Sequence, residues 1–317
     1  MKHPYTIVDA HCDTVGYFWN PGAELRTNDR HLNLDYMKQY KGYIQFFASY
    51  IDANAENYLS RTLELFDAFY REIEKNKDCV QLITDSKTLH RALDENKVGA
   101  MMTVEDARAL CGQLANLRIF YKLGVRALGL TWNHDNGVAE GALSNSGVGL
   151  TDFGREVVCE MNRLGMIVDV SHASKKAYWD VIETSTEPIM ASHSNSEAIC
   201  AHPRNLDDEQ IRAIIKTGGM IGINIFPTFL TDKETANVDD IIRHIEHILS
   251  LGGENVLGIG TDFDGIGSTP DDINNVGELY KLFDKMKKIG YSDSLITAIT
   301  HGNFVNFLDK MLKNEKN

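Results

Sequence analysis

The chain has few of the residues that mark disulfide scaffolds or linkers between domains. Its 317 residues include five cysteines and six prolines. The cysteines are scattered and odd in number, and no Cys-x-x-Cys pair occurs, so they offer no thiolate zinc site and are typical of reduced thiols in a cytoplasmic protein. No low-complexity stretch marks a boundary. We therefore expect one domain over residues 1–317.

Long apolar runs and basic clusters are also missing. No run reaches membrane-spanning length, and no signal-peptide core precedes the first apolar segment, which argues against a membrane protein. The net charge of −13 without a basic cluster argues against nucleic acid or an anionic membrane as partner. No Gly-x-Gly-x-x-Gly follows the first apolar segment, which counts against a nucleotide-binding open sheet. A composition of 43% hydrophobic and 24% charged residues is ordinary for a globular enzyme.

Apolar segments alternate with helical patterns along the whole chain. Residues 58–76, for example, carry apolar side chains at helical spacing, and Thr151 and Asp152 are typical of a helix start. Continuous apolar strands between helices indicate a parallel sheet that is buried on both faces. Eight such strands favour an α/β fold of the (β/α)8 TIM-barrel type over an open sheet. The expected strands are 7–13, 43–50, 97–104, 125–131, 166–172, 188–193, 219–225 and 256–262.

Histidines and carboxylates recur at the ends of these strands. In a (β/α)8 barrel the carboxyl ends of all strands meet on one face, where the active site lies. Any one of these residues alone is more simply read as a polar group bonded to a loop. Together they predict a functional site made of His11, Asp13, Glu105, His172, His193 and Asp262.

The number of candidate ligands exceeds what one catalytic zinc takes, which is normally three protein ligands and a water. The set suits two metals, with His11 and Asp13 on one, His172 and His193 on the other, and Glu105 between them. Two metals ~3.5–4 Å apart can share a hydroxide as nucleophile. Asp262 then remains as the general base and acid.

Six motifs resemble those of the renal (membrane) dipeptidase family, and they run in order through the chain. The resemblance implies a dizinc barrel peptidase of the amidohydrolase superfamily that cleaves dipeptides. It also implies the ligand set above, Asp262 as catalytic acid and base, and Arg204 as a substrate contact. The motifs are Asp-Ala-His-Cys-Asp at 9–13, Val-Glu at 104–105, Asp-Val-Ser-His at 169–172, Ser-His-Ser at 192–194, Arg-Asn at 204–205 and Gly-Thr-Asp-Phe-Asp-Gly at 260–265.

The chain departs from the family pattern after the fourth strand. Many family members carry a histidine there that is thought to polarise the scissile carbonyl, whereas this chain has Trp132 at that position. If the backbone stays extended, His134 faces the same side and can substitute for it. Asn303 resembles a family position near the site and is a further candidate substrate contact, with a helix cap as the simpler alternative.

The sequence thus predicts a cytoplasmic metallodipeptidase with two Zn²⁺ ions per chain and a dipeptide as its small-molecule partner. A homodimer is compatible with this prediction. The alternatives are another binuclear amidohydrolase, acting on an N-acyl amino acid, a lactone or a cyclic amide, and a barrel that has lost catalysis and only binds. The complete set of ligand candidates argues against the second alternative.

Overall fold

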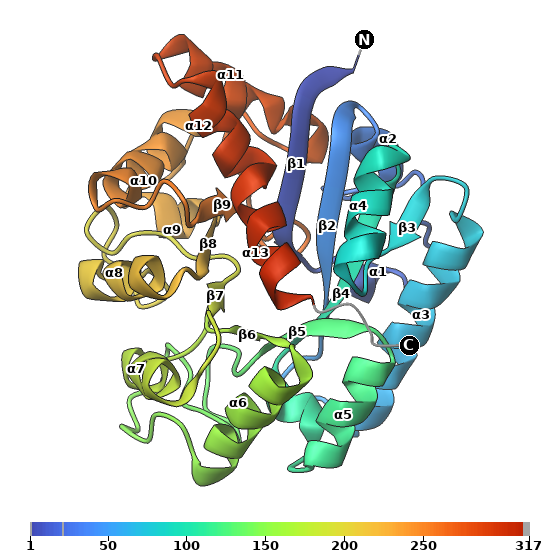
Figure 1. Cartoon of the computed structure of the whole chain (residues 1–317), viewed down its shortest axis with the longest axis vertical. Coiled ribbons are helices and arrows are strands. Elements are labelled where there is room, and N and C mark those ends of the chain that lie inside the picture. The colour runs from blue at the N-terminus through green and yellow to red at the C-terminus, as the bar shows by residue number, and fades with distance from the viewer. Residues whose placement is uncertain (1, 21, 313–317) are drawn as a thin grey trace.

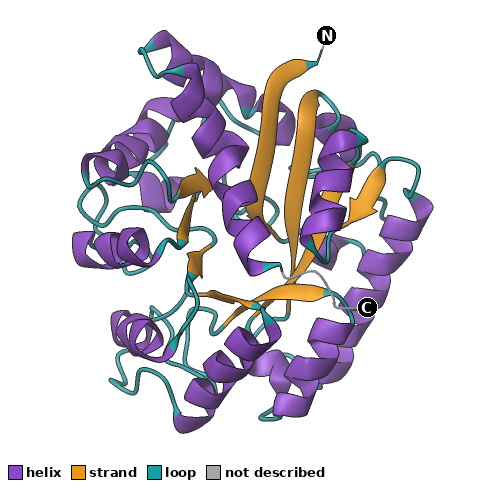
Figure 2. Cartoon of the chain, in the orientation of Figure 1, coloured by secondary structure: helices purple, strands orange, loops and turns teal. Residues whose placement is uncertain are grey.

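Eight parallel strands close into a barrel with helices around it (Figures 1 and 2). The structure is a computed structural model that describes residues 2–20 and 22–312. Each strand pairs with the next, β2 pairs with β4, and β9 pairs back to β1. This confirms the predicted (β/α)8 fold. The barrel strands are β1 (His3–Cys12), β2 (Tyr40–Tyr50), β4 (Val98–Glu105), β5 (Val125–Gly129), β6 (Ile167–Asp169), β7 (Met190–Ala191), β8 (Met220–Ile223) and β9 (Leu257–Ile259).

Helices surround the barrel, and at least one helix follows every strand, as the sequence pattern predicts (Figure 1). No helix among the described residues is long and apolar enough to cross a membrane. The longer helices are α3 (Tyr58–Lys75), α4 (Ser86–Asp94), α5 (Leu114–Lys122), α6 (Asp152–Leu164), α7 (Lys175–Thr184), α8 (Asp208–Thr217), α10 (Val238–Ser250), α11 (Tyr280–Lys288) and α13 (Asn303–Met311). The short ones are α1 (Thr14–Tyr17), α2 (Leu34–Met37), α9 (Pro227–Leu230), α12 (Asp293–Thr297) and the turns η1 (Ala107–Leu110), η2 (Val276–Glu278) and η3 (Ala298–Gly302).

One strand was not predicted from the sequence. β3 (Val80–Leu82) pairs with the first residues of β4, on the edge where β5 pairs further along. Only three residues form it, and two of them are half-buried, so neither length nor alternation marks it as a strand. β3 and α4 lengthen the connection from β2 to β4 without adding a strand to the closed barrel.

α13 closes the barrel at the end where the strands begin. Its Phe304, Phe307 and Leu308 pack among inward-facing strand residues, which include Val8, Phe46, Met101 and Met220. A Cβ atom on Gly258 of β9 would lie 2.4 Å from Cε2 of Phe304, so glycine is needed for this close contact. Because this end is filled with apolar side chains, the polar site is confined to the opposite end of the barrel.

Replacing Phe304 with alanine is expected to lower the free energy of unfolding by about 3–5 kcal/mol, because the fully buried ring would leave a cavity in the barrel interior. The shift in denaturant midpoint measures this. Val305→Ala is the matched control on the same helix, since Val305 is only partly buried. Equal shifts for the two variants would contradict the role given to Phe304.

Candidate active site

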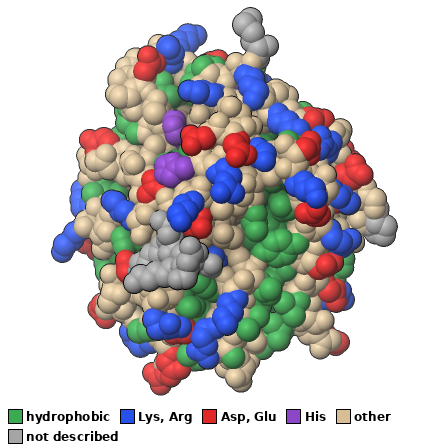
Figure 3. Space-filling model, turned by 45° about the vertical axis from the view of Figure 1, so that its right-hand side comes forward, with side chains coloured by type: hydrophobic (Ala, Val, Ile, Leu, Met, Phe, Trp, Pro, Cys, Tyr) green, Lys and Arg blue, Asp and Glu red, His purple; other side chains and the backbone are tan. Residues whose placement is uncertain are grey.

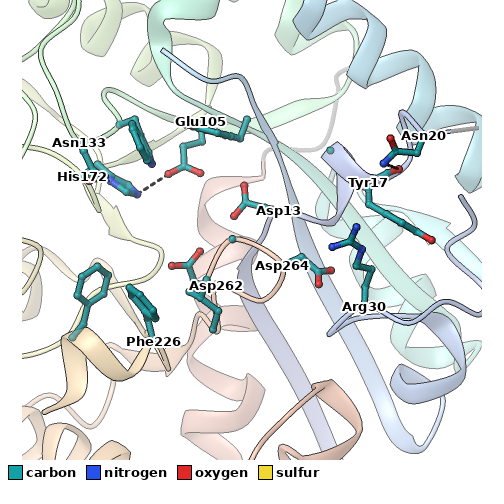
Figure 4. Close-up of a pocket in the computed structure, with 16 residues that line it drawn as sticks. Asp13, Tyr17, Asn20, Arg30, Glu105, Asn133, His172, Phe226, Asp262 and Asp264 are labelled. Carbon is teal, nitrogen blue, oxygen red and sulfur yellow. Dashed lines mark hydrogen bonds and ion pairs between the residues drawn. The ribbon is translucent and has the colours of Figure 1, made fainter. Parts of the chain in front are cut away.

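The six predicted residues meet at the carboxyl ends of five strands. His11 and Asp13 lie at the end of β1 and Glu105 is the last residue of β4, while the other three follow β6, β7 and β9. Side chains of His11, Glu105, His172 and His193 are buried, and those of Asp13 and Asp262 are nearly so. Figure 4 shows Asp13, Glu105, His172 and Asp262 directed toward a common space.

Glu105 lies between His11 on one side and His172 and His193 on the other. One carboxylate oxygen, Oε2, is 3.1 Å from Nε2 of His11, which is itself 3.3 Å from Oδ2 of Asp13. The other oxygen, Oε1, is 2.6 Å from Nε2 of His172 and 3.9 Å from Nε2 of His193. One group of potential ligands consists of His11, Asp13 and Glu105. A second consists of Glu105, His172 and His193, so the two groups share Glu105.

Hydrogen bonds fix the proton positions on His172 and His193. The hydroxyl of Ser192 lies 2.5 Å from Oδ2 of Asp169 and donates to it, so this hydroxyl accepts from Nδ1 of His193 at 2.7 Å. Nδ1 of His172 lies 2.9 Å from the amide oxygen of Asn133 and donates to it. Both Nε2 atoms are then unprotonated, as metal-ligating histidines with a bonded second nitrogen normally are.

The donor set fits a bound cation. Nε2 of His172 and Nε2 of His193 face each other at 2.9 Å, and with both protons on Nδ1 no hydrogen lies between them. Nε2 of His11 and Oδ1 of Asp13 are buried and have no hydrogen-bond partner. The facing lone pairs of His172 and His193 repel one another, and the buried atoms of His11 and Asp13 have lost their hydration. A metal ion bound among these atoms would remove both penalties.

Burial and the neighbouring charges set the protonation of the site. Burial lowers the pKa of His172 to about 4, which keeps the imidazole neutral. Burial alone would raise the pKa of Glu105, but attraction to the imidazole of His11 and, less strongly, to that of His172 outweighs burial and holds that pKa well below the ordinary value. Burial raises the pKa of Asp262 to about 7. Asp262 thus has the protonation behaviour of a group that exchanges a proton near neutral pH.

Asp262 is oriented by backbone geometry and by a residue from the neighbouring strand. Its φ of 64° is a left-handed conformation that aspartate tolerates better than most residues. Its Oδ2 accepts a hydrogen bond from Nδ2 of Asn224 at 2.9 Å, while its Oδ1 is 3.9 Å from Nε2 of His11. Asn224 directly follows β8 and was missed in the sequence, although a polar residue near the end of the otherwise apolar expected strand 219–225 is the signal that could have found it.

A buried aspartate below the site joins β1 to β9. Asp9 accepts from the backbone NH of Thr261 at 2.9 Å and from its hydroxyl at 2.6 Å. The same carboxylate lies 3.4 Å from the backbone nitrogen of His11. These bonds connect the backbone that carries His11 to the backbone that carries Asp262.

The site opens into a cavity of about 520 Å³. It is walled by the loops after β1, β5 and β8 and by the segment after β9. Both acidic and aromatic side chains line it (Figure 4). The lining residues are Asp13, Gly16, Tyr17, Asn20, Arg30, Tyr50, Glu105, Trp132, Asn133, His172, Phe226, Phe229, Asp262, Asp264, Gly265 and Ile266.

The structure does not bring His134 to the lining of this cavity. β5 ends at Gly129, and the chain bends after it instead of continuing as a strand. Trp132 and Asn133 line the cavity, whereas His134 is exposed. The alternation on which the expectation for His134 rests therefore stops before that residue. Asn133, which the sequence did not single out, contacts His172 instead.

Arg204 and Asn303 lie in different places. Arg204 is buried beside His193, with Nη2 at 3.5 Å from the carbonyl oxygen of that residue, and Nε and Nη1 have no hydrogen-bond partner. Arg204 lines a second hollow of about 300 Å³.

Asn303 donates to the carbonyl oxygens of Glu254 and Leu257, at the start of β9. The structure thus places Asn303 at the opposite end of the barrel from the ligand cluster.

Comparison with known proteins agrees with this geometry. Residues 1–317 match the membrane dipeptidase family, peptidase family M19. A crystal structure of a metallopeptidase from Rhodobacter sphaeroides, liganded with a phosphinate mimic of the dipeptide L-Ala-D-Ala, superposes with a TM-score of 0.91 at 26% identity and covers 98% of this chain and 100% of its own.

Two curated relatives match a large part of the chain. An uncharacterised protein from the pqqA 5′ region of Klebsiella pneumoniae is 36% identical over 226 residues, 68% of this chain and 83% of the relative. An uncharacterised dipeptidase of Schizosaccharomyces pombe is 35% identical over 212 residues, 66% of this chain but only 52% of the relative, so the chain spans about half of that protein. The match to the family over the whole chain shows that this protein belongs to the membrane dipeptidase family, peptidase family M19.

Proposed function

We propose that this protein is a zinc-dependent dipeptidase in which residues 1–317 form a single catalytic domain. The observation that carries the proposal is the position of Glu105, whose two carboxylate oxygens face His11 on one side and His172 on the other. The solved relative that holds a phosphinate mimic of L-Ala-D-Ala supports a dipeptide as substrate. It also supports a D residue in the second position of the dipeptide.

The ligand cluster would hold two Zn²⁺ ions. His11 and Asp13 would bind one, His172 and His193 the other, and Glu105 both. Three imidazoles with carboxylates and no thiolate suit zinc among the common divalent metals. When bound, the ions would lower the pKa of water and polarise the scissile carbonyl. The hydrogen bonds from Nδ1 of His172 and His193 keep the ligating nitrogens directed at the ions.

Asp262 would carry the proton. Its Oδ2 is occupied by the hydrogen bond from Asn224, which leaves Oδ1 facing the cluster near His11. At that oxygen it would accept a proton from the attacking water and deliver it to the departing amine. A pKa raised by burial suits both steps, because the carboxyl group then gains and loses a proton with little cost near neutral pH.

Arg204 would recognise the carboxylate at the end of the dipeptide. Its Nε and Nη1 are buried without hydrogen-bond partners. Burial lowers the pKa of Arg204 to about 10, although the nearby carboxylates of Asp262 and Glu105 act to raise it. A guanidinium with unpaired N–H groups is suited to pair with a carboxylate. Such a contact beside His193 favours substrates whose carboxylate is one residue from the scissile bond.

Two assignments complete the proposal. We assign the protein to the cytoplasm, because a reducing compartment suits its five cysteines, none of which forms a disulfide. A homodimer is compatible with the surface, since the face in Figure 3 carries a continuous apolar area bordered by charged side chains. Light scattering on the purified protein would measure the mass, and a strictly monomeric mass would exclude the dimer.

Another binuclear amidohydrolase activity is the alternative reaction. The same ligands would serve hydrolysis of an N-acyl amino acid, a lactone or a cyclic amide. Turnover of L-L and L-D dipeptides by the zinc-loaded protein supports the dipeptidase, whereas turnover of N-acetyl amino acids with none of dipeptides would select the alternative. A protein that turns over neither class would be the binding barrel.

Purified protein is expected to carry close to two zinc equivalents per chain. His193→Ala should remove mainly one of them, because His11, Asp13 and Glu105 remain as a ligand group. Elemental analysis after dialysis measures the content. His244→Ala is a matched control, since that buried histidine bonds Ser196 and Leu230 away from the cluster. One equivalent in the unmodified protein, unchanged in His193→Ala, would refute the two-metal assignment.

Asp262→Asn is expected to keep both zinc equivalents and to lose roughly 10²–10⁴-fold in turnover, because an amide cannot exchange the proton. Steady-state kinetics together with metal analysis measures both quantities. Loss of one zinc equivalent in this variant would make Asp262 a ligand instead, as its place in a group with His11 and His193 allows.

Among the residues that follow β5, we assign the supporting role in the site to Asn133, because its side-chain oxygen holds Nδ1 of His172 and so orients that imidazole. Asn133→Ala should weaken binding of one zinc ion about 10–100-fold, as loss of such an outer contact to a metal ligand does. His134→Ala, which alters the exposed neighbour, should leave zinc affinity and turnover near those of the unmodified protein. A large loss of turnover in His134→Ala with intact zinc would restore His134 as the group that polarises the carbonyl.

A further inference from the structure

Arg30 is a cation on the cavity wall that the proposed reaction does not use. Its guanidinium lies 4.5 Å from the centre of the Tyr17 ring, and both residues line the cavity with Asn20. In Figure 4, Asp13 and Asp262 lie between His172 and Arg30, so Arg30 is on the far side of the cluster from His172. A guanidinium that lies over an aromatic ring is held in orientation while its N–H groups stay free for another partner.

The loop that carries Arg30 is anchored to the site. The backbone NH of His31 donates to Oδ1 of Asp264 at 2.9 Å, and the backbone NH of Asp264 donates to Nδ1 of His31 at 3.0 Å. The backbone NH of Arg30 donates to the side chain of Asn28 at 2.9 Å. The backbone of Arg30 is therefore positioned by its neighbours on both sides, and its guanidinium is oriented by the ring of Tyr17.

The charge of Arg30 has no acidic partner in residues 2–20 and 22–312. The nearby carboxylate of Asp264 is occupied by the hydroxyl of Thr14 at 2.6 Å and by the backbone of His31. Arg61, by contrast, lies 4.6 Å from the ring of Trp19 outside the cavity and pairs with Glu64 at 3.4 Å. An oriented, unpaired guanidinium on a cavity wall is suited to a carboxylate supplied by a ligand.

The orientation of the bound dipeptide determines which of its two side chains reaches Arg30. This step rests on the proposed dipeptidase function. If the terminal carboxylate pairs with Arg204 beside His193, the amino-terminal residue would extend past the cluster to the side where Figure 4 shows Asp13. Its side chain then extends along the wall formed by Tyr17 and Arg30. We propose that Arg30 is a specificity residue that selects dipeptides with an aspartate or glutamate side chain at the amino-terminal position.

Paired substrates test this proposal. The ratio of kcat/KM for Glu-Ala over Gln-Ala isolates the charge, since the two dipeptides have nearly the same shape. We expect Arg30→Gln to reduce this ratio roughly three- to fivefold, the size expected for a partly exposed ion pair. Arg30→Glu should reduce it further and raise kcat/KM for Lys-Ala relative to Gln-Ala. Arg61→Gln, which removes an equal charge outside the cavity, should leave both ratios unchanged.

The outcomes separate this inference from the proposed function. If no dipeptide is hydrolysed, the dipeptidase function fails. If Gln-Ala and Ala-Ala are hydrolysed but the Glu-Ala to Gln-Ala ratio is the same in wild type and Arg30→Gln, the function stands and the role of Arg30 is refuted. If Arg30→Gln changes only the ratio of Ala-Glu to Ala-Gln, the amino-terminal assignment is overturned.

Discussion

The two carboxylate oxygens of Glu105 and the facing imidazole nitrogens of His172 and His193 form the contact on which the site depends. Without a cation this contact is unfavourable, because buried lone pairs lie within 2.9 Å of one another. The barrel must nevertheless hold them there. It does so by ending β4, β6 and β7 at one rim, so that the closure of the sheet imposes the separation of the ligands.

Hydrogen bonds below the ligands transmit this constraint to the strands. Asp169 accepts from the backbone and hydroxyl of Ser192 and so connects β6 to β7, as Asp9 connects β1 to β9 through Thr261. Each buried aspartate thus stabilises a strand pair and orients a ligand beside it. We therefore expect loss of either carboxylate to weaken both the strand pair and the positioning of the neighbouring ligand.

The cluster and the cavity wall have different origins. The residues of the ligand cluster lie at strand ends, whose positions are fixed by the barrel itself. The wall comes from the loops after β1, β5 and β8, which contribute Arg30, Trp132 and Phe226. In enzymes of this architecture the loops at the carboxyl ends of the strands usually determine which substrate is bound.

The sequence alone determined the barrel and placed the six site residues at or just after the ends of five strands, because apolar runs and helical spacing reflect local geometry. Only the tertiary structure placed His134 outside the cavity, Asn303 at the far end of the barrel and Asn133 against His172. A loop side chain has no fixed period, so its direction depends on where the loop packs against residues distant in the sequence.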